Sequence, residues 1–280
     1  MNALMYHDVV AAGAEDTSGF PGRDAALYKV TPERFGAHLD AIREFVRAER
    51  PARPARPAPH SLPVSQAPPA PATPPAPVVT LDDGGVSAMR AAEALEARGL
   101  VGRFFITANY IGARGFVTDR DVRDLTSRGH IVGSHSCSHP LRMARCSWSQ
   151  LLDEWTRSCD ILGEILGEKV RVASVPGGDF APQVAEAAAR AGITTLFTSE
   201  PTGGSRQAFG LELVGRFAIQ KRTGAATAAA LAAGDWLPCA RQAIVWNAKK
   251  VSKRLGGEKY LQLRKLLIGH GSEVRWGDQP

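Results

Sequence analysis

Short apolar runs alternate with longer amphipathic segments along most of this chain. The apolar runs are rich in β-branched or aromatic side chains, which favours buried strands. They predict strands at residues 3–6, 78–81, 103–107, 131–134, 170–175, 194–198 and 213–219. The amphipathic segments predict helices at residues 32–49, 87–98, 119–127, 147–166 and 182–191. This alternation predicts an α/β fold in which helices cover a parallel sheet.

The length and composition of the chain agree with one globular enzyme. Its 280 residues, 44% of them hydrophobic, can form one large core. No apolar stretch is long enough to span a bilayer, and residues 1–7 lack the pattern of a secretory signal. Four cysteines form no Cys-x-x-Cys pair, so free thiols in a reducing compartment are the simplest interpretation. We therefore expect a cytoplasmic protein.

Residues 51–77 interrupt this pattern, because eleven of these 27 residues are proline. So proline-rich a segment cannot carry a helix or a central strand. The part of the chain before it is too short to fold alone. We interpret it as a disordered Pro/Ala-rich insertion within one catalytic domain at residues 1–240, with a Pro-rich docking peptide as the alternative.

The positive charge is concentrated at the end of the chain. From Arg241 onward there are nine Lys and Arg against three Asp and Glu, which equals the formal net charge of +6. Apolar residues at 244, 248, 251 and 255 follow helical spacing, so residues 241–280 predict a basic helical extension. Its basic face is either solvated on a docked helix or in contact with an anionic glycan, a lipid-linked intermediate or a membrane surface. Nucleic acid is not expected, because no aromatic platform accompanies the charge.

Two clusters of metal-ligand residues follow two of the predicted strands. Asp82 and Asp83 follow the second strand, and His135 and His139 follow the fourth. The carboxyl ends of parallel strands meet at one rim, so the two clusters are candidates for one site. Two His and one carboxylate, with positions left open, are typical of a catalytic divalent-metal site. The second carboxylate is then free to act as a base on water, which predicts a hydrolase.

The same residues resemble the polysaccharide deacetylase family, also called carbohydrate esterase family four, with its chitooligosaccharide deacetylase-like domain. The family's T-F-D-D-G motif is similar to Thr80-Leu81-Asp82-Asp83-Gly84, and its H-[ST]-x-x-H motif to His135-Ser136-Cys137-Ser138-His139. Further likenesses lie at residues 5–8, 104–107 and 176–178. The resemblance implies a distorted (β/α)7 barrel of the polysaccharide deacetylase type.

The resemblance also implies a role for each site residue. Three residues would hold a divalent ion, most simply Zn²⁺, with Co²⁺ or Ni²⁺ as alternatives: Asp83, His135 and His139. Asp82 would be the catalytic base. The turn Pro176-Gly177-Gly178 would donate a backbone N–H to the oxyanion. Cys137 has no role in the family and is interpreted as a buried filler.

Two parts of the family pattern are altered in this chain. The third motif, R-x-P-x-G, begins with an arginine that orients the base, and Ser174 stands at that position. Another group must therefore hold Asp82, and Arg171 is the arginine nearest to Ser174 in sequence. The segment Asp235-Trp236 lacks the Asp that precedes the family's acidic-Trp motif, and His270 follows a helical pattern typical of a surface histidine. His7, at the end of the first strand, is the candidate proton donor, with a buried structural histidine as the alternative.

We therefore expect a metal-dependent carbohydrate deacetylase that removes N- or O-linked acetyl groups from a polysaccharide or a glycan precursor. Its partner would be an acetylated glycan or a lipid-linked glycan precursor, in the cytoplasm or peripheral to the inner membrane. One alternative is a hydrolase of linear non-peptide amides on the same scaffold. The other is a non-catalytic carbohydrate-binding or scaffold protein, although the retention of all four metal-site residues disfavours it.

Overall fold

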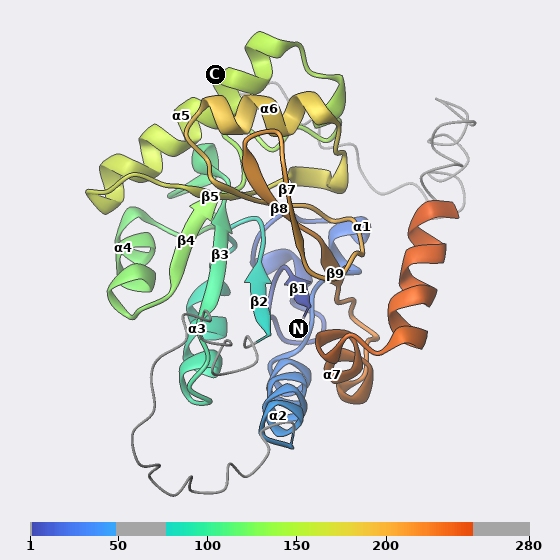
Figure 1. The fold of residues 1–280 in the computed structure, drawn as a ribbon. Helices are drawn as coiled ribbons and strands as arrows, with labels where there is room; N and C mark the ends of the chain where they lie inside the picture. The colour runs from blue at the N-terminus through green and yellow to red at the C-terminus, as the bar shows by residue number, and fades with distance from the viewer. Residues whose placement is uncertain (1, 49–76, 249–280) are drawn as a thin grey trace, which may run out of the picture.

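The computed structural model describes residues 2–48 and 77–248. Nine strands in this part form one sheet in the order β7-β8-β6-β5-β4-β3-β2-β1-β9 (Figure 1). Neighbouring strands are parallel throughout, except for the antiparallel pair β7–β8. The predicted α/β fold with a mostly parallel sheet is confirmed.

The strands agree closely with the apolar runs of the sequence. They are β1 (Ala3–Tyr6), β2 (Val78–Leu81), β3 (Gly102–Ile106), β4 (Ile131–Ser134), β5 (Val172–Ser174), β6 (Thr195–Phe197), β7 (Ser205–Ala208), β8 (Leu211–Val214) and β9 (Arg216–Ala218). The run at residues 213–219 differs from its prediction as one strand, because it is divided at Gly215. A Cβ at Gly215 would lie 2.0 Å from the Thr202 hydroxyl oxygen, so this passage requires glycine.

The division at Gly215 joins the two ends of the parallel sheet. β8 pairs with β6, whereas β9, which follows one residue later, pairs with β1 on the far side of the sheet order. The segment from β8 to β9 therefore passes from one end of the sheet to the other. If β8 and β9 are counted as one strand, they and β1 to β6 make seven parallel strands. This number is compatible with the predicted distorted (β/α)7 barrel.

Six longer helices surround this sheet. They are α2 (Pro32–Ala48), α3 (Ala88–Glu96), α4 (Asp119–Ser127), α5 (Trp148–Leu166), α6 (Pro182–Arg190) and α7 (Ala225–Ala233). Neighbours contact one another in the order α7, α2, α3, α4, α5, α6, so the helices form an outer layer (Figure 1). α5 begins at a capping box between Ser147 and Gln150, with the Gln150 amide donating to Ser147 Oγ at 3.3 Å. A short helix, α1 (Arg23–Ala26), lies in the loop after β1.

A further helix at residues 236–248 follows α7 and runs through the predicted boundary at residue 240. No described helix combines the length and the apolar character needed to cross a bilayer. Most of the insertion at 51–77, the extension beyond residue 248 and His270 lie outside the described residues. The division into a catalytic domain and a basic extension stays a prediction.

Gly133 in β4 allows close packing between the strands that carry the site. A Cβ at this position would lie 2.5 Å from the carbonyl oxygen of Val172 and 2.8 Å from the ring of Phe105. Its φ is not positive, so the requirement for glycine is one of space and not of backbone conformation.

We expect Gly133→Ala to lower the free energy of unfolding by about 1–3 kcal/mol, because β4 must move away from β5. The matched control is Gly224→Ala, because a Cβ at Gly224 meets no heavy atom within 4 Å. That variant should change stability by less than about 1 kcal/mol, the scale of an N-cap substitution. Urea denaturation measures both, and equal effects would show that the packing at Gly133 is looser than described.

Candidate metal centre

The two predicted ligand clusters lie at the carboxyl ends of β2 and β4, with β3 between them. Backbone hydrogen bonds continue beyond both strand ends. The amide of Asp82 donates to the carbonyl of Tyr6 at 3.0 Å, and the amide of His135 donates to the carbonyl of Ile106 at 2.8 Å. Both clusters are therefore fixed on the same rim, as the parallel arrangement predicted.

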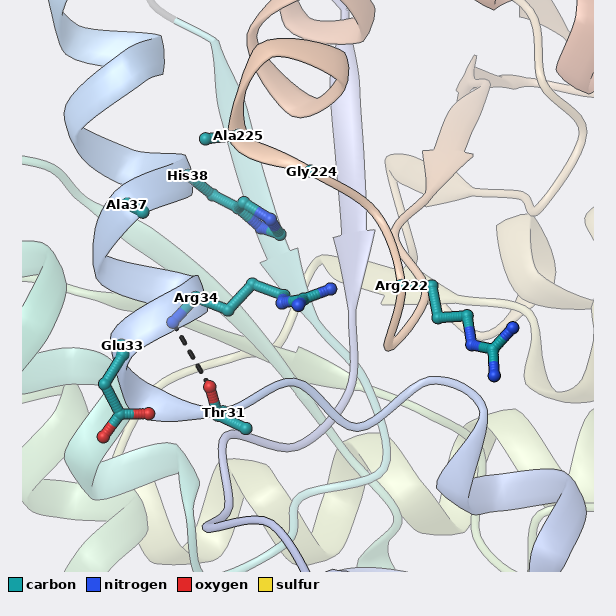
Figure 2. A pocket seen from close by; sticks show the side chains of 8 residues that line it. All are labelled: Thr31, Glu33, Arg34, Ala37, His38, Arg222, Gly224 and Ala225. Carbon is teal, nitrogen blue, oxygen red and sulfur yellow. Dashed lines mark hydrogen bonds between the residues drawn. The ribbon is translucent and has the colours of Figure 1, made fainter.

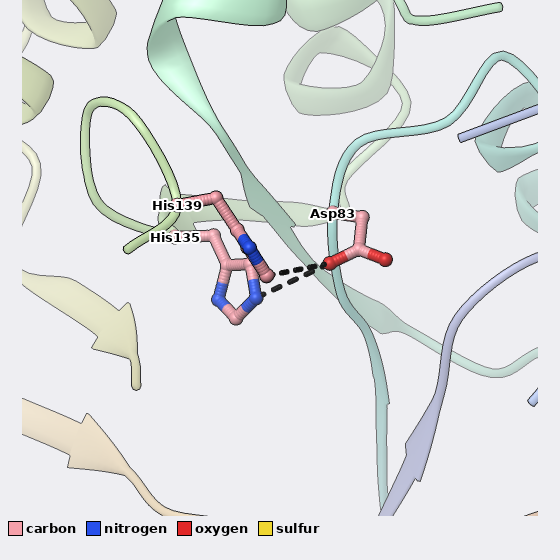
Figure 3. A group of neighbouring side chains, drawn as sticks. All are labelled: Asp83, His135 and His139. Atoms are coloured by element: carbon pink, nitrogen blue, oxygen red, sulfur yellow. Dashed lines mark ion pairs between the residues drawn. The ribbon is translucent and has the colours of Figure 1, made fainter. Parts of the chain in front are cut away.

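Asp83, His135 and His139 form one compact group (Figure 3). Nε2 of His135 lies 3.3 Å, and Nε2 of His139 3.4 Å, from the same carboxylate oxygen, Oδ1 of Asp83. Asp83 and His135 are buried, and His139 is half-buried. Two imidazole nitrogens and a carboxylate oxygen within 4.8 Å of one another fit a divalent cation. This geometry supports the predicted ligand set.

The backbone of the site is strained. Asp83, Ser136 and His139 have φ values of 76°, 63° and 59°, a region that non-glycine residues rarely adopt. Only one other non-glycine residue in the described chain has a positive φ. Such strain persists only where surrounding contacts impose it, and it is concentrated at functional sites.

Glu154 on α5 provides much of that support for the loop between the two histidines. Its carboxylate accepts hydrogen bonds from the amides of Cys137 and Ser138, at 2.9 and 2.8 Å, and from the Ser138 hydroxyl at 2.5 Å. The Ser136 hydroxyl also accepts from the amide of His139 at 3.1 Å. No pattern in the sequence indicated the role of Glu154, because a single acid on an amphipathic helix usually faces solvent.

Cys137 is buried in this loop but does not belong to the ligand group. Its Sγ donates a hydrogen bond to Oδ1 of Asn109 at 3.0 Å. Burial raises the pKa of the thiol to about 11, so the sulfur stays protonated at neutral pH. These contacts support its interpretation as a filler.

Ser174 orients the ring of His135. Nδ1 of His135 lies 2.6 Å from the hydroxyl and 3.1 Å from the carbonyl oxygen of Ser174. If Nδ1–H donates to that carbonyl, Nε2 is directed to the side of Asp83. There it can donate to the carboxylate when the ring is protonated, or present a lone pair to a cation when the ring is neutral, as metal-ligating histidines do. Burial alone would raise the pKa of Asp83, but hydrogen bonds from His135 and His139 hold it well below its ordinary value.

Arg216 at the start of β9 takes the place of the missing arginine. Its guanidinium makes two hydrogen bonds to Asp82, Nη1 to Oδ1 at 2.6 Å and Nη2 to Oδ2 at 2.8 Å. Nη1 also donates to the Thr80 hydroxyl at 2.9 Å, and Nε donates to the carbonyl of Thr198 at 3.0 Å. Arg171, the nearest candidate in sequence, is exposed just before β5, at the other end of that strand from Ser174.

The pairing with Arg216 sets the charge state of Asp82. Both side chains are buried, at 0% and 2% exposed. Burial by itself would raise the pKa of Asp82, but the charges of Arg216 and His135 outweigh it and lower that pKa below its ordinary value. Asp82 is thus a carboxylate at neutral pH, held 4.0 Å from Nε2 of His135. A sequence signal for Arg216 did exist, since it is a charged residue inside an otherwise apolar strand.

The loop between β1 and α2 brings His7 and Phe20 to the site. The Phe20 ring lies 4.6 Å from that of His139, and the His7 ring lies 4.9 Å from that of Tyr28. Buried Nδ1 of His7 has no hydrogen-bond partner among the described residues. A positive charge on His7 would help to lower the pKa of both Asp82 and Asp83, which places its imidazole in the neighbourhood of the two carboxylates. His7 is therefore suitably placed for the predicted proton donor, and its role stays a prediction.

The Pro176–Gly178 turn follows β5 directly, two residues after Ser174. Gly177 and Gly178 have φ values of 62° and 64°, which favour glycine. A Cβ at Gly178 would lie 2.8 Å from Cη2 of Trp246, so the indole of the last described helix covers this turn. The predicted role of the turn as an oxyanion donor remains untested.

A separate hollow of about 500 Å³ lies between the first turns of α2 and α7 (Figure 2). None of the predicted site residues line it. Nε2 of His38 lies 2.9 Å from the carbonyl oxygen of Thr223, and Arg34 donates to the carbonyl of Lys221 at 2.7 Å. These contacts attach the segment before α7 to α2, which is a structural role.

Comparisons with known proteins agree with this fold. Residues 70–196 match the profile of the family described as polysaccharide deacetylase. No match is found among curated protein sequences. The fold is similar to that of the Streptococcus pyogenes deacetylase PplD in complex with acetate, with a TM-score of 0.59 and 18% identity over 80% of this chain and 94% of that one.

Two other solved structures show the same fold. IcaB from Ammonifex degensii has a TM-score of 0.59 and 19% identity, over 82% of this chain and 96% of that one. A de-N-acetylase from Aggregatibacter actinomycetemcomitans has a TM-score of 0.58 and 18% identity, over 80% of this chain and 96% of that one.

We expect Arg216→Met to lower the free energy of unfolding at pH 7 by about 3–5 kcal/mol, because Asp82 is left buried without its partner. The pH dependence of the free energy of unfolding should also change sign. In the parent protein the lowered pKa of Asp82 gives stability that is lost as pH falls below about 4. In the variant burial raises that pKa, so stability increases as pH falls from 7 toward 4.

Arg103→Met is the matched control, since the Arg103 guanidinium also lies over the Phe197 ring, at 5.9 Å, as that of Arg216 does. This variant should lower the free energy of unfolding by only about 1 kcal/mol and keep the parental pH dependence of stability. Denaturant titrations of the parent protein and both variants, from pH 7 to about one unit below pH 4, measure these effects. A parental pH dependence in Arg216→Met would contradict the assigned pairing.

Proposed function

Because the chain belongs to the polysaccharide deacetylase family, we propose that it is a metal-dependent hydrolase of acetyl groups on a glycan. The acetyl groups are N- or O-linked, and the substrate is a polysaccharide or a glycan precursor. The observation that carries this proposal is the group of Asp83, His135 and His139 beside the charged, buried carboxylate of Asp82. The donor set and its spacing fit Zn²⁺, with Co²⁺ or Ni²⁺ as alternatives.

Asp82 is the base in this proposal. A divalent ion held by Asp83, His135 and His139 would act as a Lewis acid, which acidifies water and polarises the acetyl carbonyl. Asp82 takes the proton of the attacking water, and the hydrogen bonds from Arg216 keep both of its oxygens in place. The same pairing limits how basic Asp82 is, because it lowers the pKa of the carboxyl.

The remaining steps are assigned to His7 and the turn at Pro176–Gly178. His7 donates a proton to the leaving nitrogen or oxygen of the sugar, so that an amine or hydroxyl departs. A backbone N–H of the turn donates to the oxyanion, and the glycines allow the positive φ values that the turn requires. Acetate is the other product.

The cytoplasm is the proposed compartment, with a position peripheral to the inner membrane for a lipid-linked precursor. A hydrolase of linear amides would use the same residues, and substrate tests distinguish it. The non-catalytic alternative rested on the missing general acid of the family and, as a second ground, on the absence of the arginine at Ser174. Arg216 weakens that ground, because the base has a bidentate partner from another strand.

We expect purified protein loaded with Zn²⁺ or Co²⁺ to release acetate from oligomers of N-acetylglucosamine or from an acetylated sugar ester. A chelator should abolish release, and Asp82→Asn should reduce it by about 10²–10⁴-fold while metal content stays unchanged. Release of ammonia from simple amides without acetate from sugars would favour the linear-amide alternative. Metal binding without turnover of any of these substrates would favour the non-catalytic one.

The metal assignment has its own control in the same loop. His139→Ala should lose most of the bound metal, measured by elemental analysis. Cys137→Ala should keep it, since Cys137 lies between the two histidines but outside the ligand group. Equal metal content in the two variants would show that the site is assigned wrongly.

We expect His7→Gln to slow acetate release from an N-acetyl sugar by about 10²–10⁴-fold, because the amine must leave with a proton. With p-nitrophenyl acetate the effect should be less than about tenfold, since nitrophenolate leaves without protonation. Steady-state kinetics on the two substrates, with metal content as a control, measure the difference. An equal loss on both would assign His7 a structural role.

A further inference from the structure

The helix at residues 236–248 is attached to the rest of the fold by one face only (Figure 1, red). Gln242 hydrogen-bonds the backbone of Ala218, accepting from its amide at 2.8 Å and donating to its carbonyl at 3.0 Å. Cys239 packs against the core and accepts from Nδ2 of Asn2 at 3.5 Å. Trp246 covers Gly178. Positions 239, 242, 243 and 246 thus make up the inner face of this helix.

The outer face of the same helix is largely apolar, with Arg241 and Asn247 as its exposed polar residues. Trp236, Leu237 and Ile244 are 79%, 70% and 68% exposed, the three highest values among the large apolar side chains of the described chain. Val245 adds a fourth exposed apolar side chain. Helical spacing places Trp236 and Ile244 in one row, with half-buried Ala240 between them and Leu237 beside it, so the exposed side chains adjoin one another. A helix on a soluble protein would ordinarily expose polar residues here.

We propose that this outer face binds the surface of a negatively charged lipid bilayer. The charge of the adjoining sequence complements such a surface, because Lys249, Lys250, Lys253 and Arg254 follow the helix within six residues. From residue 241 onward the chain carries its whole formal net charge of +6. Exposed tryptophan and aliphatic side chains beside basic residues are typical of helices that lie in a membrane interface.

The charge also disfavours a second copy of the chain as the occupant. A symmetric dimer through this face would bring together two segments that each carry the entire net charge. A bilayer that contains anionic lipids has the opposite sign, so both the apolar and the electrostatic contributions favour binding there.

The position of the helix relates this surface to the metal centre. Trp246 lies against Gly178, in the turn that follows the β5 strand whose last residue, Ser174, contacts His135. A bilayer bound by this helix would lie alongside the rim that carries the site. This step rests on the proposed function. The placement makes one substrate class the most accessible to the site, namely a glycan attached to a lipid carrier.

Flotation of the full-length protein with lipid vesicles tests the proposal. We expect binding to vesicles of phosphatidylcholine with 30% phosphatidylglycerol at least about tenfold tighter than to phosphatidylcholine alone. The double variant Trp236→Ser/Ile244→Ser should bind the anionic vesicles about tenfold more weakly. Val101→Ser, which removes an exposed valine (53%) before β3, is the matched control and should bind like the parent protein.

Three results would overturn the proposal. One is the absence of flotation with anionic vesicles, and another is equal binding by the double variant and the parent protein. The third is shielding of Trp236 from acrylamide quenching before vesicles are added, judged against Trp236→Ser, since the face would then be covered by this chain or by a second copy. Acetate release from a soluble acetylated oligosaccharide should be the same in all variants. If the parent protein binds vesicles but releases no acetate, that result would count against the hydrolase function and not against the proposed membrane-binding face.

Discussion

The buried pair between Arg216 and Asp82 is the interaction on which the candidate site depends. Neither charge is stable in the interior without the other, because each loses its hydration there. The guanidinium also donates to the carbonyl of Thr198 after β6, so one side chain joins β9, β2 and the end of β6. It does so where the sheet passes from one end to the other at Gly215. The closure of the fold and the placement of the base therefore rely on the same contact.

Around this pair hydrogen bonds hold the side chains and the backbone of the site in place. Strained backbone at Asp83 and His139 is held by hydrogen bonds from neighbouring loops and from α5, and the ring of His135 is fixed by Ser174. Preorganised ligands lose little entropy when a cation binds, and a base that is already oriented needs no rearrangement during the reaction.

The sequence predicted those parts that depend on local pattern. Apolar runs located β1, β2 and β4 to the residue, and parallel strand ends explain why Asp83 and His135 meet. Two elements gave no such signal. The strand β7 is polar and exposed, and α7 is so rich in alanine that its two faces do not differ.

Long-range partners were harder to predict than elements. Arg216 is 134 residues from Asp82, and no periodicity relates the two. The absence of arginine at Ser174 showed that a partner was needed without showing where it was. The strand order, which places β9 beside β1 and β1 beside β2, supplies the answer. Glu154 was missed for the same reason, since its partners lie in a loop before its own helix.

Anomalous X-ray diffraction at the zinc edge, from crystals grown with Zn²⁺, is the most direct test of the metal centre. We expect one strong peak within about 2.0–2.2 Å of a carboxylate oxygen of Asp83 and of Nε2 of His135 and His139. Asp82 should remain paired with Arg216 and should not coordinate the ion. A peak at another place, or coordination by Asp82 instead of Asp83, would contradict the assignment of ligand and base.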